Sequence, residues 1–261
     1  MSDFNPSGAD ITEAILRSYS GSKSVDISGL IVEFEFIQSM EAQNWIGSLT
    51  IQDSTGLLEN FPLRAEEYID LTVVSYDLGT EVKLKTRVYK ISDAIPTESN
   101  NGVLFVMHIV SDITFQASTR RITKAYEGKM DEIVKEVFDT YFSRLGNGRR
   151  TDADLRSRSR TEMPYETQKY SIISDSDRFF YIQENTAGKS QVIIPYLAPA
   201  QAMTFLCARS YAGISCPSQT FRFFETLDAY YYATDEFFIA SNSAGRSVKT
   251  LFYCLHYQAV D

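Results

Sequence analysis

Apolar and polar positions alternate through much of the first half of the chain. In residues 30–37 one face at a period of two carries Glu33 and Glu35, while the opposite face is apolar. The apolar positions of this run are Leu30, Val32, Phe34 and Phe36. Comparable short runs cover residues 45–53, 69–76, 82–91 and 103–113. Five short strands joined by turn signals predict an antiparallel barrel or sandwich.

The run at residues 82–91 alternates most regularly. Its apolar positions are expected to point inward and its cations outward. The inward set is Val82, Leu84 and Val88, and the outward set is Lys83, Lys85 and Arg87. The first twenty residues lack this alternation, and the segment Asp10–Glu13 can cap a helical turn. We therefore predict a weak helix or an arm at the N-terminus.

A helical period replaces the strand period after residue 129. Apolar side chains follow a spacing of three and one from Met130 to Leu145, which predicts an amphipathic helix ended by glycines. A second helix is expected from Pro199 to about Tyr211. The Arg-rich residues 149–164 predict an exposed loop, and residues 221–238 predict an aromatic hairpin.

The composition agrees with a folded, β-rich protein. The 261 residues are 44% hydrophobic and include 17 Phe and 16 Tyr, and aromatic residues favour strands and interfaces. Three cysteines and two histidines provide no zinc-ligand spacing, so we expect reduced core thiols, no metal and no cofactor. No secretory signal or long apolar run is visible, so no membrane binding by this chain is expected.

The charge is acidic and unevenly distributed. The chain carries 34 acidic and 25 basic residues, a formal net charge of -9. This balance argues against a nucleic-acid-binding protein, because binding to phosphates requires a basic surface. Acids concentrate in residues 26–70 and arginines in residues 144–160. Each of these stretches is either a solvated surface or a patch for a charged partner.

A phosphate-binding loop is disfavoured. The segment Ala187–Ser190 resembles the end of such a loop, but the position that requires the first glycine is Gln183. The motif also needs a following helix, whereas residues 192–195 are typical of a strand.

Candidates for other catalysis are weak as well. His108 and His256 lie near no recognisable nucleophile motif. Carboxylate pairs of the kind that glycosidases use occur at Glu66–Glu67 and at Asp175 with Asp177. Such pairs arise by chance among 34 acids. We therefore expect no catalytic residue in this chain.

Four segments in order along the chain carry a further signal. They read GSLTIQD at 47–53 with PLRAEE at 62–67, YEG at 126–128 with IV at 133–134, PAQAM at 199–203 with ARS at 208–210, and FRFFET at 221–226. Together they resemble baseplate hub proteins of contractile-tailed, myovirus-type bacteriophages. The positions that match this tube-like hub family are Gly47, Asp53, Pro62, Leu63, Glu67, Pro199, Arg209, Phe223, Phe224 and Glu225.

The chain departs from the family pattern at several positions. Ala65, Ala200 and Ala229 stand where the hub pattern has glycine, phenylalanine and glycine. Longer hubs continue with further strands after the aromatic hairpin, which complete a second barrel. In this chain the second barrel is either abbreviated or completed by another chain.

The resemblance implies a mainly β (α+β) fold: a tube-type antiparallel β-barrel with inserted helices and a partial second barrel-like region. Combined with the periodicities, it predicts four parts. They are an N-terminal arm at 1–23, a first barrel at 24–118, a helical insertion with an Arg-rich loop at 119–165, and a second, incomplete β region at 166–261, which holds one helix and the hairpin.

The resemblance also implies a structural role without catalysis. Hub proteins form a homotrimeric, pseudo-sixfold ring between the tail tube proteins and the central spike protein, with baseplate wedge proteins around it and DNA passing through. The implied location is the virion, in the tail baseplate, after assembly in the host cytoplasm. An acidic channel would repel the DNA backbone, so Glu33 and Glu35 are candidate channel-facing acids. The alternative, which the sequence supports equally, is that these two side chains face solvent or a contact between subunits.

Two alternative functions remain. The spike protein of type VI secretion systems shares a hub-like region, although it continues into a long β-prism. A carbohydrate-binding or carbohydrate-active β protein of the tail would use the paired carboxylates and exposed tyrosines.

Overall fold

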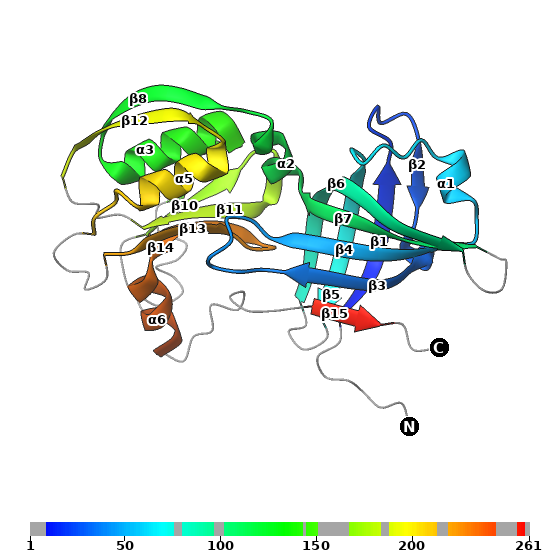
Figure 1. The fold of residues 1–261 in the computed structure, drawn as a ribbon. Helices are drawn as coiled ribbons and strands as arrows, with labels where there is room; N and C mark the ends of the chain where they lie inside the picture. Colours follow the sequence, from blue (N-terminus) through cyan, green and yellow to red (C-terminus); the bar gives the residue numbers. More distant parts are fainter. Residues whose placement is uncertain are drawn as a thin grey trace. The chain divides into compact units, whose positions relative to one another are not determined.

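A computed structural model describes residues 9–75, 80–96, 102–142, 145–150, 167–183, 188–212, 219–243 and 255–258 (Figure 1). Two compact units divide the chain. The first unit comprises residues 1–38, 45–115 and 252–261, and the second comprises residues 39–44 and 116–251. The chain therefore passes from one unit to the other more than once.

The first unit is built on an antiparallel sheet in the order β15-β3-β4-β7-β6-β5-β1-β2. The strands are β1 (Ala9–Arg17), β2 (Ser24–Asp26), β3 (Ile31–Ile37), β4 (Ile46–Asp53), β5 (Tyr68–Ser75), β6 (Thr80–Pro96), β7 (Val103–Ser111) and β15 (Leu255–Gln258). The sheet curls until β1 lies near β15 (Figure 1). Short helices follow three of the strands: η1 (Ser28–Leu30), α1 (Leu57–Asn60) and α2 (Asp112–Ser118). The predicted mainly β fold with an antiparallel, barrel-like sheet is confirmed.

The alternation seen in the sequence corresponds to the inner and outer faces of this sheet. Phe34 and Phe36 are buried on the inner face of β3, and Leu84 and Val88 are buried on β6. The exception is Arg87, which was expected to point into solvent and is only 5% exposed. Its Nε donates to Asp112 Oδ1 at 2.8 Å, and its guanidinium lies 3.4 Å from the centre of the Tyr68 ring. Arg87 is buried because the start of α2, which the alternation did not predict, supplies the carboxylate.

The N-terminal segment corrects the sequence-based prediction. Residues 9–17, expected to form a helix or an arm, form β1 in the sheet, paired with β5. Ala14 and Leu16 are fully buried. A register shift between Ile11 and Glu13 interrupts the period of two, which hides this strand in the sequence. Pairing along the length of β5 satisfies more backbone groups than a capped turn could.

The second unit contains a five-stranded sheet and a separate two-stranded ribbon. The strand order of the sheet is β13-β14-β11-β10-β9. The pair β11–β14 is parallel, and the other three pairs of neighbouring strands are antiparallel. Its strands are β9 (Leu145–Arg150), β10 (Thr167–Ile172), β11 (Asp175–Gln183), β13 (Phe221–Glu225) and β14 (Ala229–Thr234). The ribbon pairs β8 (Ile122–Gly128) with β12 (Ser190–Leu197).

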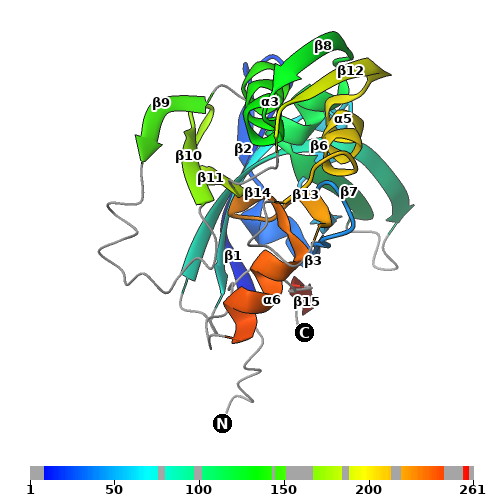
Figure 2. The ribbon, with the colours of Figure 1, turned by 90° about the vertical axis from the view of Figure 1, so that its left-hand side faces the viewer.

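Helices pack between these two layers of the second unit. They are α3 (Met130–Val137) with its π-helical continuation η2 (Phe138–Phe142), and α5 (Pro199–Cys207). Figures 1 and 2 show α3 and α5 side by side beneath the ribbon. The predicted apolar stripe is buried from Met130 to Phe142, except for the partly exposed Tyr141. The helix ends earlier than predicted, since Leu145 begins β9.

Two other predictions for the second unit are partly correct. The hairpin forms as expected from β13 and β14, but residues 235–238 belong to an unpredicted helix, α6 (Asp235–Ser243). Residues 149–150 lie in β9 rather than in an exposed loop. The remainder of that predicted loop, residues 151–164, lies outside the described residues.

Aromatic rings fill the core of the second unit. The Phe138 ring stacks on Phe180 with a centroid distance of 4.1 Å, and the Tyr230 ring meets Phe138 edge-on at 5.0 Å. On the other face of the hairpin, Phe224 packs against Tyr231 and Phe238. Facing rings at these distances add to the area that they bury. The Phe and Tyr excess is therefore used inside the fold.

One ion pair lies within this core. Arg178 on β11 and Glu225 on β13 are 2% and 0% exposed, and their charged atoms are 2.8 Å apart. Arg178 also donates to the backbone oxygen of Thr226 at 2.6 Å and lies over the Tyr230 ring. Burial disfavours the charged guanidinium, but the Glu225 carboxylate outweighs it and raises the pKa of Arg178. The pair therefore joins β11 to the hairpin.

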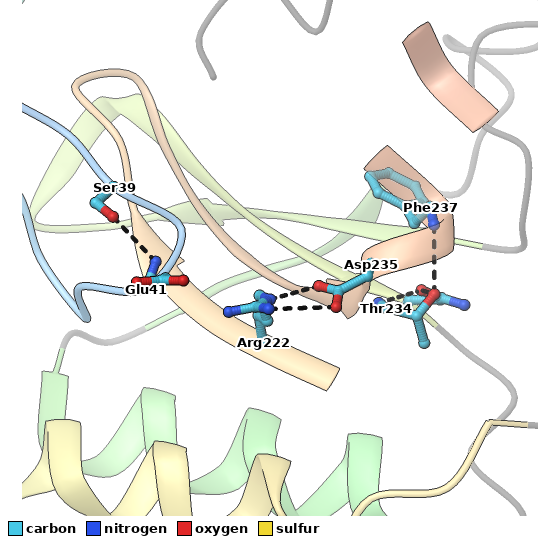
Figure 3. Close-up of polar contacts among 7 residues, drawn as sticks. Ser39, Glu41, Arg222, Thr234, Asp235 and Phe237 are labelled. Carbon is cyan, nitrogen blue, oxygen red and sulfur yellow. Dashed lines mark hydrogen bonds and ion pairs between the residues drawn. The ribbon is translucent and has the colours of Figure 1, made fainter. Parts of the chain in front are cut away.

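The loop between β3 and β4 belongs to the second unit. Met40 packs against the cluster around Phe224, and Gln43 Nε2 donates to Thr204 Oγ1 at 2.6 Å. Figure 3 shows Arg222 of β13 between Glu41 of this loop and Asp235, the first residue of α6. Arg222 donates to both carboxylate oxygens of Asp235.

Removing one member of the buried ion pair should destabilise the protein strongly. Glu225→Gln leaves the Arg178 charge buried without its counterion, so the free energy of unfolding should fall by about 3–5 kcal/mol. The control is Glu136→Gln, which breaks the exposed Lys124–Glu136 pair and should cost at most about 1 kcal/mol. Urea denaturation measures both values. Equal losses in the two variants would contradict this role for Glu225.

Candidate functional site

The two predicted channel acids share one face of β3. Glu33 and Glu35 are partly exposed on the face opposite the buried Phe34 and Phe36. Across the ladder, Glu33 lies opposite Thr50 and Glu35 opposite Ser48. The strand thus presents two carboxylates 2 residues apart on the outer face of the sheet, beside hydroxyl side chains. Whether they line a channel remains a prediction.

The rest of the acidic stretch serves several separate purposes. Asp70 pairs with Arg17 at 2.9 Å on the surface, and Asp26 accepts a hydrogen bond from the backbone of Ser28. Asp53 and Glu67 are buried. Residues 26–70 therefore do not form one continuous acidic surface, and the acids of β3 are the ones that share a strand face.

Asp53 organises the turn that ends β4. Its carboxylate accepts hydrogen bonds from the backbone N–H groups of Thr55, Leu57 and Leu58 at 2.8–3.0 Å, which covers the start of α1. Burial acts against the charged form, but these hydrogen bonds outweigh it and lower the pKa of Asp53 from its ordinary value. Asp53, Glu59 and Gly102 line an open hollow beside this turn. The Asp53 carboxylate is engaged by the backbone, so it is not available to a ligand in this hollow.

Glu67 organises the next turn in the same way. It is fully buried, and its two oxygens accept hydrogen bonds from the backbone N–H groups of Arg64, at 2.5 Å, and Glu66, at 3.1 Å. Between them, Ala65 has a φ of 62°, in the left-handed region that favours glycine. This is the position where the hub pattern has glycine. Pro62 is exposed and Leu63 partly buried at the entry to the turn.

Gly47 is required by close packing in β4. A Cβ atom at this position would lie 2.8 Å from Cδ1 of Phe36 and 3.0 Å from Cγ1 of Ile109. A larger residue would therefore displace core side chains on both neighbouring strands.

The family-motif positions of the second unit also belong to its framework. Pro199 is the first residue of α5, where its missing N–H costs no hydrogen bond. Arg209 is exposed after the end of this helix and lies 3.5 Å from the centre of the Phe205 ring. Phe223 and Phe224 lie on opposite faces of the hairpin within the aromatic core, and Glu225 is the buried partner of Arg178.

The structure brings a serine, an aspartate and a histidine together on the outer face of β6 and β7. Ser92 Oγ lies 2.8 Å from His108 Nε2 and donates to Asp93 Oδ2 at 2.8 Å. A hydroxyl has one proton, so a Ser92 that donates to Asp93 must accept from His108. In a nucleophilic triad the histidine takes the serine proton and the aspartate contacts the histidine. This arrangement therefore does not activate Ser92.

Other chemical candidates are placed as follows. Glu66 is exposed beside the engaged Glu67, and Asp175 is buried near Arg178, while the side chain of Asp177 lies outside the described residues. Residues 192–195 lie in strand β12, not in the helix that a P-loop needs.

The described part of the chain holds neither a cluster of metal ligands nor a helix that could cross a membrane. There, no group of three His, Cys, Asp or Glu residues could hold a metal ion. In the same residues no helix combines the length and hydropathy needed to cross a bilayer.

The buried positions of Arg178 and Arg87 do not follow from the sequence pattern. Both are cations in apolar strands, and each finds a carboxylate more than 20 residues away along the chain. An isolated Arg at a strand position, next to aromatic residues, was the available signal.

Replacing Ala65 by glycine should stabilise the protein. Left-handed backbone costs a residue with a Cβ about 1–2 kcal/mol, and glycine removes that cost at the expense of some unfolded-state entropy. We expect the free energy of unfolding to rise by about 1 kcal/mol. Ala125→Gly, in strand β8, is the control and should lose about 0.5–1 kcal/mol. Chemical denaturation of both variants measures the difference in sign, and a loss at both positions would refute the assignment of strain to Ala65.

Comparisons with known proteins establish no family. No family model matches the chain, and no curated protein matches it. Similar solved structures include the prophage tail protein gp18 from Listeria monocytogenes, with 9% identity and a TM-score of 0.43 over 87% of this chain and 52% of that protein. Another is the 43 kDa tail protein of prophage MuSo2 from Shewanella oneidensis, with 10% identity and a TM-score of 0.45 over 85% and 53%. A tail protein from Neisseria meningitidis MC58 has 9% identity and a TM-score of 0.33 over 51% and 34%. The chain spans about half the length of the first two, and identities and TM-scores this low establish no function.

Proposed function

We propose that this chain is a structural baseplate hub protein of a contractile phage tail. In this proposal three copies form a pseudo-sixfold ring that joins the tail tube to the central spike and lets DNA pass. The wedge proteins surround the ring in the virion, and assembly takes place in the host cytoplasm. The role is structural rather than enzymatic.

The observation that carries the proposal is that the positions matching the hub family have structural roles in this fold. The residues that resemble the hub family in order along the chain occupy corners and cores of a mainly β fold: Gly47 and Asp53 at either end of β4, and Phe224 and Glu225 in the hairpin. Ala65 stands in left-handed backbone at the position where the pattern has glycine. Such residues shape a scaffold, and a ring scaffold needs rigid subunits joined by head-to-tail contacts that close.

A second candidate function is carbohydrate binding by a tail β protein. Tyr196 and Tyr211 are 72% and 63% exposed, and exposed aromatic rings are what sugar-binding surfaces use. The third candidate is the hub-like part of a type VI secretion spike, which would form a similar ring but would belong to a secretion system and not to a phage.

The mass of the protein in solution distinguishes these functions. Light scattering should give about three times the 29.6 kDa chain mass for the hub, with no retention on a glycan array. Adding the tail tube or spike protein of the same phage should produce a complex of threefold symmetry under the electron microscope. A monomer at all concentrations that binds or cleaves sugar would overturn the hub proposal.

The channel role of β3 has its own test. The double substitution Glu33→Lys and Glu35→Lys changes the net charge from -9 to -5, because each substitution replaces a negative charge by a positive one. If these side chains line the channel, the variant ring should be retained on threaded linear duplex DNA at low salt, unlike the unsubstituted ring. Glu13→Lys with Glu81→Lys makes the same charge change on exposed positions of β1 and β6 and is the control. Equal retention of both variants, or a map with both β3 carboxylates on the outer wall, would exclude the channel role.

A further inference from the structure

The barrel sheet of the first unit is completed by a strand from the far end of the chain. β15 pairs with β3 over four residues, from Leu255 opposite Phe36 to Gln258 opposite Glu33. The other seven strands of this sheet all end before residue 112. Between them and β15, residues 116–251 belong to the second unit.

The position beside β3 is one that needs a strand. β4 pairs with the other side of β3, so without β15 a row of backbone N–H and C=O groups of β3 would be open. Phe34 and Phe36 on this strand are 1% and 0% exposed, so the strand that borders them lies along the core. An unfilled position here would be a template for any free strand.

β15 is held by a short ladder, and among the pairings of this sheet within the described residues only that of β2 with β1, at three positions, is shorter. It has four paired positions with β3, whereas β1 and β5 share eight. Eleven residues, 244–254, separate it from the end of α6. Fully extended, such a segment spans roughly 40 Å, more than the width of a small domain.

The same four-residue ladder can form between two copies of the chain. A β15 from a neighbouring copy would meet β3 in the same register and satisfy the same backbone groups, so exchange loses no pairing. Because the donated strand and the accepting strand are different surfaces, the contact is head-to-tail. Head-to-tail contacts generate closed rings when the rotation between copies closes.

We propose that β15 is exchanged between copies in the assembled ring, so that the barrel of each copy is completed by the C-terminal strand of its neighbour. This inference rests on the proposed trimeric ring and names the element that links its subunits. It assigns to residues 255–258 the role of an assembly strand, and to β3 the role of its acceptor.

Engineered disulfides between β3 and β15 test the exchange. One variant carries Glu35→Cys and a second, with a different affinity tag, carries His256→Cys, the position directly opposite in the ladder. Directly paired strand residues have the Cα separation that a disulfide needs. Cys216 and Cys254 are replaced by serine in both. Cys207 is retained, because burial raises the pKa of its thiol to about 12 and keeps it unreactive.

The two variants are co-expressed, oxidised and separated by mass before a non-reducing gel. Exchange predicts a disulfide between two differently tagged chains in the trimer fraction, and none in the monomer fraction. The matched control co-expresses Glu35→Cys with Ser48→Cys, which lie opposite each other on β3 and β4 of one hairpin and should give no link between chains.

A single-chain variant with both Glu35→Cys and His256→Cys completes the design. A trimer whose disulfides all close within one chain, with no link in the mixed sample, overturns the exchange and leaves the ring standing. A protein that stays monomeric and closes within one chain overturns both the exchange and the proposed ring.

Discussion

The second unit depends on one ion pair inside an aromatic core. Arg178 and Glu225 are both buried, and each would be costly there without the other. The guanidinium also donates a hydrogen bond to the Thr226 backbone oxygen and lies 4.7 Å from the centre of the Tyr230 ring. Since Arg178 belongs to β11 and Glu225 to β13, the pair links two strands of the same sheet across β14, which lies between them. The rings of Phe138 and Phe180 can then stack between this sheet and the helices.

The first unit obeys a different constraint, a sheet with one face buried. Its charged residues are used at corners, where Asp53 and Glu67 accept backbone hydrogen bonds from the turns that follow β4 and precede β5. These carboxylates hold the turns in place, and their oxygens are engaged by the backbone N–H groups. The acids of β3 instead share one partly exposed strand face.

Several features of the fold could be predicted from local pattern. The strands at β3 to β7, the stripe from Met130 to Phe142 and the hairpin at Phe221 each show their period within a few residues, because one face of each is buried. The strand β1 was hidden by a bulge, and α6 begins directly after β14, inside the run that was predicted to be one hairpin. The burial of Arg87 could not be predicted, since its partner Asp112 is 25 residues away. The proposed channel acids Glu33 and Glu35 were placed on one face by alternation alone, and their role depends on an assembly that alternation does not describe.

The sequence by itself determined the periods of burial, the turn residues and the family resemblance, because these depend on neighbours along the chain. Only the tertiary structure decided which distant residues meet. It pairs Arg178 with Glu225, brings β15 to the edge of β3, and places Ala65 in left-handed backbone above the buried Glu67. These contacts arise from the burial of charge and backbone polar groups, whose partners are chosen by distance in space and not by distance in sequence.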